Sequence, residues 1–371
     1  MGAKISQFTN RGYGTYLLKE KFKVVANRMN IHIVITHPDE DHYNFLQASF
    51  DGELLKQVKE IVIGSKFEDY GKTFKSWVSE TDNMPPVYTV NNGSECYGNS
   101  DCRWTLVPVQ SNIGRSKLSY TAKYRHHTDM SMMDGDPWQF CGGDVGISVL
   151  GANICVRDKN KPKHCIYDNK NARSVILKLA YKEWSLFLSG DFEGERQQRK
   201  FINQWSPKVL QSTYYKVAHH GAWRMEEQAN LPYLLNIIRP KRAYVSQAHP
   251  IMTFCVKYLH PRCEVIEHLL EIGTIDKIDS SARNSIVCWE DFGKRSGRIE
   301  QRSGYAIYET CREYDTDLDK QICHDIMITT DGYNDHTTYV GVPREYLYIR
   351  EHFQPSRKCR KPLEDLKKQL P

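Results

Sequence analysis

The chain of 371 residues lacks any apolar run near the roughly 20 residues that a membrane-spanning helix requires. It is therefore predicted to contain no integral membrane segment. Its first residues, MGAKISQF, also lack the apolar core of a secretory signal peptide. From this absence we expect a cytoplasmic, intracellular protein.

The 11 cysteines lack any CxxC pair, and their number is odd. A disulfide framework in a small secreted domain normally uses an even number of cysteines. We therefore interpret the cysteines as reduced thiols of an intracellular protein, with no part in a functional site.

The sequence has no large excess of charge of one sign, because 51 Lys and Arg residues face 45 Asp and Glu residues, a net charge of +6. This excess fits an ordinary surface and is compatible with an anionic substrate. Hydrophobic residues at 40% and charged residues at 26% exclude collagen-like and wholly disordered chains. The length allows two or three domains, or one large α/β domain with insertions.

Short apolar runs alternate with helix-length segments along the chain, which is typical of a layered α/β fold. The stretch 65–145 is rich in Gly, Asn, Ser and Asp, and it predicts a loop-rich insertion with a few strands. Beyond about residue 293 the pattern changes to a Tyr-rich, charged stretch. The predicted strands are 31–35, 60–64, 147–150, 174–180, 184–188, one within 209–218, 242–246 and 286–289, and the predicted helices are 44–60, 193–204, 224–238 and 263–272.

The first cluster that carries chemistry follows the strand predicted at 31–35. His37, Asp39, Asp41 and His42 place two imidazoles and two carboxylates within six residues. A turn here can gather them around one or two ions, and this mixed ligand set suits zinc, manganese or iron. The alternative is a solvated loop that is rich in Asp and His.

Three further groups lie at or near the ends of predicted elements: Asp191 in LSGD, His219 and His220 in AHHG, and His260 in YLHP. Taken singly, Asp191 also fits a turn aspartate. A layered α/β fold collects strand ends at one edge, so the recurrence of His and Asp predicts one shared site.

Three other histidines receive a different interpretation. His126 and His127 lie in the predicted insertion, where we expect surface or substrate-rim residues. His249 also precedes a proline and resembles His260 in this. We favour His260 because a tyrosine lies two residues before it and a predicted helix follows it.

The order of these motifs resembles the metallo-β-lactamase fold superfamily. It is most similar to the soluble metallo-β-lactamase-like domain of ComEC-type DNA-uptake proteins and their free-standing relatives. The resemblance runs from about 31 to 290, with a poor match over 43–146. The segments that carry it are THPDEDH at 36–42, NARSVIL at 171–177, LSGD at 188–191, YKVAHHG at 215–221 and YLHP at 258–261.

The resemblance implies an αββα sandwich over about residues 1–292, followed by an extension, 293–371, of unknown role. It also implies one or two divalent metal ions, zinc first and manganese second. His37 and Asp39 would serve one metal position, Asp41 and His42 a second, and Asp191 would bridge them. His219 or His220 would complete the set, with His260 as a further ligand or, alternatively, a substrate contact.

The chain departs from the pattern of the family in four places. The superfamily normally has two or three strands and an Asp-x-Gly turn before the His motif, whereas only 36 residues precede His37 and the first aspartate is Asp39. Asn171 stands near the place of a third-motif histidine, as in the ComEC-type branch. Ala222 replaces a serine, and 293–371 has no counterpart that we recognise.

From the motifs and the resemblance we predict a metal-dependent hydrolase that acts on phosphodiesters. Metal ions lower the pKa of a bound water toward ~7, which supplies hydroxide at neutral pH. Asp39 or Asp191 would orient that water. His219 or His220 would protonate the leaving oxygen, because imidazole titrates near neutral pH.

Nucleic acid is the predicted substrate, from the resemblance and the net charge of +6. Lys216 and Asn171 are candidates for substrate contact, although a surface lysine is the alternative for Lys216. The basic cluster 357–361 is available for phosphates, with a solvated tail as the alternative. The sequence leaves the oligomeric state open.

Two other functions remain open. One is a hydrolase of a lactone, a thioester or a lipid-like ester. The N-terminal MGAKIS fits the N-myristoylation pattern at Gly2, which would favour this function and place the protein at a membrane periphery. The other is a non-catalytic metallo-β-lactamase-like binding protein, which the missing N-terminal strands and third-motif histidine motivate.

Overall fold

The computed structural model divides the chain into two compact units. Unit 1 comprises Met1–Lys178, Ser189–Phe192 and Arg196–Gln204, and unit 2 comprises Leu179–Leu188, Glu193–Glu195 and Trp205–Pro371. The residues that the structure describes are 30–44, 46–50, 52–91, 103–109, 120–123, 138–140, 144–154, 156–157, 160, 165–166, 170–223, 228–246, 260–272, 283–291, 297–313 and 322–345.

Unit 1 contains a five-stranded sheet in which the strands follow the order of the sequence. β1 (Ile31–Ile35), β2 (Val58–Ile63) and β3 (Val87–Asn91) are parallel. β4 (Arg103–Pro108) and β5 (Tyr120–Lys123) continue the sheet antiparallel. The apolar runs form these strands because β-branched residues pack well on a pleated sheet. The strand predicted at 31–35 is confirmed.

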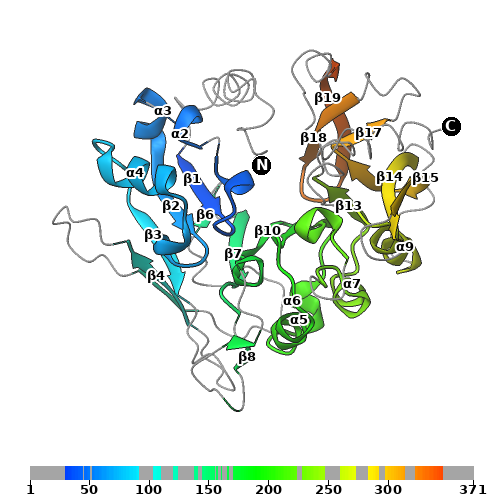
Figure 1. Cartoon of the computed structure of the whole chain (residues 1–371), viewed down its shortest axis with the longest axis horizontal. Helices are drawn as coiled ribbons and strands as arrows, with labels where there is room; N and C mark the ends of the chain where they lie inside the picture. Colours follow the sequence, from blue (N-terminus) through cyan, green and yellow to red (C-terminus); the bar gives the residue numbers. More distant parts are fainter. Residues whose placement is uncertain are drawn as a thin grey trace, which may run out of the picture. The chain divides into compact units, whose positions relative to one another are not determined.

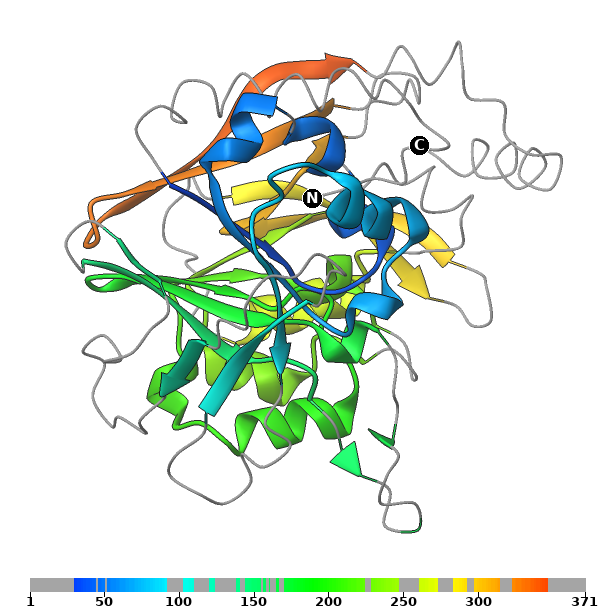
Figure 2. The ribbon, with the colours of Figure 1, turned by 90° about the vertical axis from the view of Figure 1, so that its left-hand side faces the viewer.

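Helices cover one face of β1–β3 in unit 1 (Figure 1, Figure 2). They are α2 (Leu46–Ser49), α3 (Gly52–Gln57) and α4 (Lys72–Glu80). The helix α4 buries Phe74, Trp77 and Val78, which share one face through their i, i+3 and i+4 spacing. These side chains join the isoleucines of β1 and β2 in one hydrophobic core.

Two predictions for this part of unit 1 are wrong in part. The single helix predicted at 44–60 is two short helices followed by β2. The stretch 65–91, predicted as the start of a loop-rich insertion with a few strands, contains β3 as one such strand, but it also contains the unpredicted helix α4 and a 3-10 turn (Phe67–Asp69). The turn-forming residues lie between the helix and the strand of this stretch and do not interrupt them. The apolar residues of α4 recur at regular helical spacing.

The rest of unit 1 contains shorter elements. Gly151 lies so close to Phe201 that a Cβ at this glycine would meet the ring at 3.2 Å. Phe201 in turn contacts Phe192, with ring centroids 5.7 Å apart. The elements are β6 (Trp138–Phe140), β7 (Val145–Gly151), β8 (Val156–Arg157), β9 (Cys165–Ile166), a 3-10 turn (Asn171–Arg173), the start of β10 (Ile176–Tyr181) and most of α5 (Glu195–Ile202).

Unit 2 contains four neighbouring parallel strands: β11 (Trp184–Leu188), β12 (Tyr214–Lys216), β13 (Arg242–Val245) and β16 (Ile307–Glu309). Its helices are α6 (Pro207–Leu210), α7 (Pro232–Ile238) and α9 (Cys263–Glu271). The other strands are β14 (Arg283–Asp291), β15 (Gly297–Tyr305), β17 (Cys311–Glu313), β18 (Ile322–Thr330) and β19 (Asp335–Glu345). Both units combine helices and strands, so the α/β class is confirmed.

Residues beyond 293 are part of unit 2. β16 pairs with β13 in the parallel sheet. The turn between β18 and β19 lies against the start of β11, where the N–H groups of Glu183 and Trp184 donate to the carbonyl of Gly332 at 3.0 Å each. The predicted boundary at 292/293 therefore does not coincide with the division into units.

The cysteine prediction is wrong for one pair. Cys263 at the start of α9 and Cys288 in β14 form a disulfide across 25 residues of sequence. A backbone hydrogen bond lies close to this disulfide, because the N–H of Trp289 donates to the carbonyl of Pro261 at 2.8 Å. This disulfide removes part of the basis for predicting a cytoplasmic location, because disulfides persist in oxidising compartments.

Several predictions concern residues outside those that the structure describes. They are the acylation pattern at Gly2, the histidines His126, His127 and His249, and the basic cluster 357–361. Within the described residues, none of the helices has the length and apolar character that crossing a bilayer requires.

Candidate metal centre

The chain brings His37 and His42 together through a tight turn after β1. Asp39 lies before a 3-10 turn (Glu40–His42), and the N–H of His42 donates to the carbonyl of Asp39 at 3.0 Å. The turn reverses the chain, so the two imidazole rings lie with their centroids 4.0 Å apart. A cluster that is compact in sequence is thus compact in space.

Asp191 reaches the same place from the segment Ser189–Phe192 of unit 1. Its N–H donates to the hydroxyl of Ser174 at 3.2 Å. The preceding Gly190 has φ +57°, and a Cβ there would lie 2.7 Å from the Cβ of Thr36. Only glycine permits both this left-handed backbone and this close approach. The glycine of LSGD therefore lets the carboxylate reach the histidines.

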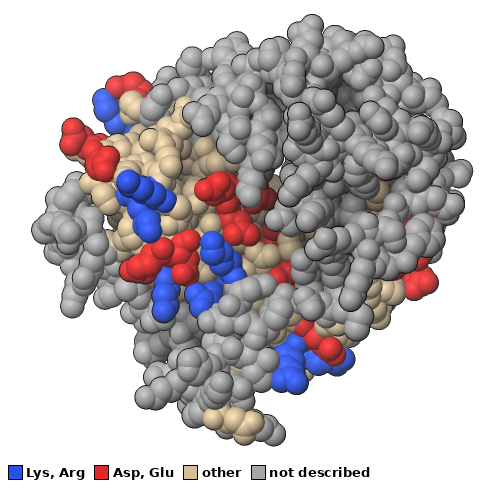
Figure 3. Space-filling view, viewed as in Figure 1, with Lys and Arg blue, Asp and Glu red and all other residues tan. Residues whose placement is uncertain are grey.

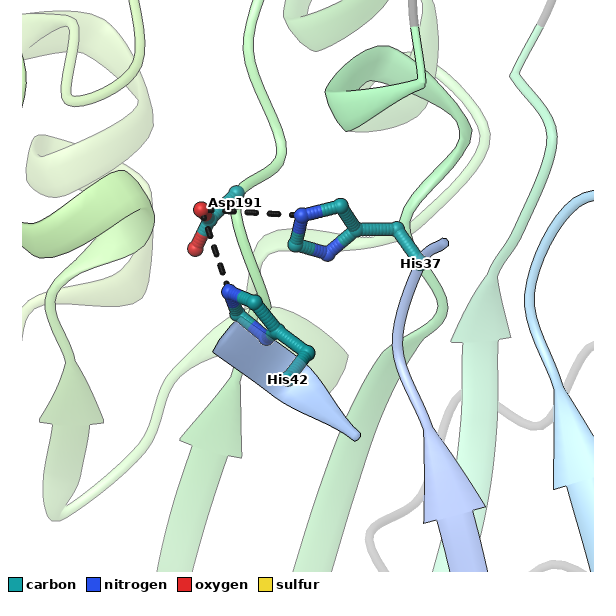
Figure 4. A group of neighbouring side chains, drawn as sticks. All are labelled: His37, His42 and Asp191. Carbon is teal, nitrogen blue, oxygen red and sulfur yellow. Dashed lines mark ion pairs between the residues drawn. The ribbon is translucent and has the colours of Figure 1, made fainter. Parts of the chain in front are cut away.

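Asp191 is shared by both imidazoles (Figure 4). Its Oδ2 lies 3.7 Å from Nε2 of His37 and 3.3 Å from Nε2 of His42. One ligand atom from each of the three residues lies within 4.8 Å of the others, and His37 and Asp191 are buried. Two ligands bound tetrahedrally to one zinc at its usual distances are about 3.4 Å apart. The spacing therefore allows a single ion to contact all three residues.

Thr36 orients both imidazoles through one hydroxyl group. Its Oγ1 lies 3.2 Å from Nδ1 of His37 and 3.2 Å from Nδ1 of His42. A hydroxyl oxygen accepts from both Nδ1–H groups when each ring carries its proton on Nδ1. That tautomer directs both Nε2 lone pairs to the side of Asp191. Metal-binding histidines are commonly oriented by such a partner on the second ring nitrogen.

The two remaining carboxylates of the motif lie at the rim of this cluster. Oδ2 of Asp39 is 3.7 Å from Nε2 of His37, and Oδ2 of Asp41 is 3.5 Å from Nε2 of His42. The interaction with His37 is the main cause that lowers the pKa of Asp39, and burial opposes it. The ammonium of Lys170, 3.9 Å from Oδ1 of Asp39, also lowers this pKa.

Burial strongly changes the acid–base behaviour of His42. Removal from water lowers the pKa of His42 to about 4, although the carboxylate of Asp191 acts in the opposite direction. At neutral pH the imidazole is therefore uncharged. A metal ion requires this form of histidine, because protonation removes the lone pair that binds the ion.

His219 and His220 lie in unit 2, in the turn Ala218–Gly221 that follows β12. Both have left-handed backbone angles, with φ 45° and 54°. Such angles cost about 1–3 kcal/mol for each non-glycine residue and are concentrated at functional sites. Nδ1 of His219 lies 2.7 Å from Oε2 of Glu193, and Nδ1 of His220 lies 2.5 Å from the carbonyl oxygen of Ser246.

His260 is buried in the same unit, with its ring centroid 5.3 Å from that of His219. His219 and His260 therefore lie close together within unit 2. Gly221 assists this approach, because a Cβ there would lie 2.5 Å from the Cβ of Pro261. The N–H of Arg262 donates to the carbonyl of Gly221 at 2.9 Å.

A comparison with protein-family models finds no match to this chain, and a comparison with curated proteins finds none either.

The predicted substrate contacts have separate places in the two units. Asn171 begins a 3-10 turn of unit 1, and its carbonyl accepts the N–H of Ser174 at 2.9 Å. Lys216 is the last residue of β12 in unit 2 and is half-buried. Asn171 thus helps to position Ser174, whose hydroxyl accepts the N–H of Asp191. A role in substrate binding for Asn171 or Lys216 stays a prediction.

Sequence reasoning singles out the candidate ligands but not the residues that position them. Thr36, Ser174 and Gly190 lie inside the quoted motifs, so the motifs contain the signal. Glu193 follows LSGD by two residues, and only its tertiary partner His219 distinguishes it from a surface glutamate. Asn230, whose Oδ1 accepts the N–H of Ala218 at 3.0 Å beside His219, lies in none of these motifs.

Proposed function

We propose that the protein is a metal-dependent hydrolase of phosphodiesters, built as a metallo-β-lactamase-like αββα sandwich. The observation that carries the proposal is the convergence of His37, His42 and Asp191, whose ligand atoms lie within 4.8 Å of one another. The order of the sequence motifs supports the sandwich, as does the layer of helices on one face of the unit 1 sheet. Zinc is the proposed metal, with manganese as the second choice.

A divalent ion bound here supplies a Lewis acid and lowers the pKa of water toward ~7. The residues of the chain provide the rest. Thr36 holds the two imidazoles in the tautomer that binds an ion, and burial keeps His42 uncharged. Asp39 and Asp41 lie at the rim, where each can accept a proton from water or serve as a further ligand.

Nucleic acid is the proposed class of phosphodiester, from the resemblance and from the net charge of +6. On the face shown in Figure 3, the described residues carry Lys and Arg side by side with Asp and Glu. Recognition on this part of the surface would therefore depend on the site and not on a uniformly basic patch.

Metal analysis of the 371-residue chain tests the proposal. After treatment with a chelator and dialysis against zinc or manganese, we expect at least one ion per chain by mass spectrometry. His42→Ala and Asp191→Ala should lose it. His32→Ala is the matched control, because His32 lies on β1 and pairs with Glu60 at 2.9 Å outside the cluster.

Hydrolysis of bis(p-nitrophenyl) phosphate, with p-nitrophenyl acetate beside it, tests the chemistry. We expect metal-dependent cleavage of the diester that Asp191→Ala abolishes and His32→Ala preserves. Cleavage of the acetate alone would favour the ester hydrolase. If the protein binds less than one ion per chain and cleaves neither substrate, the result would favour a non-catalytic binding protein.

A further inference from the structure

The buried carboxylate of Glu193 has an imidazole as its partner. Its Oε2 lies 2.7 Å from Nδ1 of His219, and the Glu193 side chain is 1% exposed against 13% for His219. Carboxylates are rarely buried this completely unless they are paired. The contact joins two residues of unit 2 that are 26 positions apart in sequence.

The buried side chain of Asn230 holds the backbone on both sides of His219, and the hydroxyl of Tyr215 also accepts the N–H of Ala218 at 3.2 Å. Oδ1 of Asn230 accepts from the hydroxyl of Tyr215 at 2.8 Å and from the N–H of Ala218 at 3.0 Å. Its Nδ2 donates to the carbonyls of Ala218 at 2.9 Å and Ala222 at 3.4 Å. These bonds lie on both sides of the left-handed residues, so the turn has its own support besides the contact of Glu193 with the ring.

The fixed backbone of the turn and the carboxylate of Glu193 beside Nδ1 together determine on which nitrogen the imidazole of His219 carries its proton. A carboxylate accepts hydrogen bonds, so it favours the imidazole form that carries a proton on Nδ1. We propose that Glu193 is a positioning residue that holds the proton of His219 on Nδ1, which leaves Nε2 as the reactive nitrogen. Orientation of a working histidine by a carboxylate is a recurring arrangement in enzymes and metal sites.

The chain offers a matched Glu–His pair for comparison. On α9, Nδ1 of His268 lies 3.6 Å from Oε2 of Glu271, whose side chain is 75% exposed. This separation is longer than a hydrogen bond, and solvent reaches the carboxylate. We therefore expect His268 to exchange its proton between both nitrogens, whereas His219 should not.

Nitrogen-15 NMR of the 371-residue chain labelled at histidine tests the assignment near neutral pH. We expect a proton on Nδ1 of His219, seen as a low-field proton signal that His219→Gln removes. Glu193→Gln should reduce this signal, because a glutamine amide can donate as well as accept. Glu271→Gln should leave it unchanged. A His219 that carries no proton on Nδ1 in the wild-type protein overturns the inference, even if Glu193→Gln fails to fold.

The kinetic part of the test rests on the proposed function. With bis(p-nitrophenyl) phosphate we expect Glu193→Gln to lower kcat at least tenfold with little change in KM, and Glu193→Asp to recover part of that loss. Equal kinetics in Glu193→Gln and the wild type overturn the positioning role. A wild-type protein without hydrolytic activity contradicts the proposed function, while the NMR result still decides the proton position.

Discussion

The two pairs of neighbouring histidines differ in what holds them. In unit 1, one hydroxyl, that of Thr36, contacts Nδ1 of both His37 and His42. In unit 2, His219 and His220 each have a separate acceptor, the carboxylate of Glu193 and the carbonyl of Ser246. The first pair shares its support, whereas the second pair has two independent supports.

The distances from the ring nitrogens to the nearest carboxylate also differ between the two pairs. The Nε2 atoms of His37 and His42 lie 3.7 and 3.3 Å from one carboxylate oxygen of Asp191, as ligands of a common ion would. Nδ1 of His219 lies 2.7 Å from Oε2 of Glu193, which is a direct hydrogen bond. The first pair could thus hold one ion together with Asp191, whereas each ring of the second pair has its own hydrogen-bond partner.

Loss of Asp191 should have the largest effect, because this residue distinguishes the histidine pair of unit 1 from that of unit 2. Asp191→Ala removes the oxygen that faces both imidazoles, so we expect zinc affinity to fall by more than about 100-fold, beyond the range typical of supporting residues. Calorimetric titration of zinc measures this. Asp69→Ala is the control, because Asp69 pairs with Arg173 at 3.0 Å in the same unit. Unchanged zinc affinity in Asp191→Ala would contradict the shared-ion interpretation.

Acid should destabilise the metal-free protein through His42. The unfolded chain takes up this proton as the pH falls below about 6.5, whereas the pKa of folded His42 is lowered to about 4. The free energy of unfolding should therefore decrease across this window, by about 3 kcal/mol in total from this residue. Urea unfolding at several pH values measures it. His42→Asn should flatten the dependence, and an equal slope in both proteins would contradict the burial argument.

Removal of the support of the unit 2 turn should have a smaller effect. Asn230→Ala leaves buried backbone groups and the Tyr215 hydroxyl without this partner, so we expect a loss of about 2 kcal/mol in the free energy of unfolding. Asn334→Ala, at an exposed turn, should change it by less than about 0.5 kcal/mol. Urea unfolding compares the two. Equal stabilities would show that the left-handed turn persists without Asn230.

The smallest effect is expected for the shared hydroxyl. Thr36→Val keeps the shape of the side chain but removes the partner of both Nδ1 atoms, and zinc affinity should fall about tenfold. Thr36→Ser keeps the hydroxyl and should retain most of the affinity. Zinc titration of the two variants separates hydrogen bonding from packing. A loss in Thr36→Ser alone would assign the role of Thr36 to its methyl group, which Thr36→Val retains.

The sequence predicts the local parts of the candidate site well. The run IHIVI predicts β1, and the six residues from His37 to His42 contain both imidazoles because a tight turn keeps sequence neighbours together in space. Asp191 is also identifiable, since LSGD ends an apolar strand. In each of these segments the local sequence is enough to predict the backbone conformation of the few residues that carry the motif.

The long-range parts do not follow from the sequence in the same way. The disulfide between Cys263 and Cys288 joins residues whose pairing no spacing rule determines. Glu193 and Asn230 act through partners that only the tertiary fold supplies. The helix α4 escapes prediction because turn-forming residues surround it, although its apolar spacing is regular.

The crowding around Thr36 has a consequence for how this protein can change. A Cβ at Gly64 would lie 1.9 Å from the backbone oxygen of Thr36, and a Cβ at Gly190 would lie 2.9 Å from its hydroxyl oxygen. Loss of the hydroxyl at position 36 would not relieve the crowding, because a Cβ at Gly190 would also lie 2.7 Å from the Cβ of Thr36. Gly190 is therefore expected to remain glycine whichever side chain occupies position 36, so this part of the chain has little freedom for stepwise divergence.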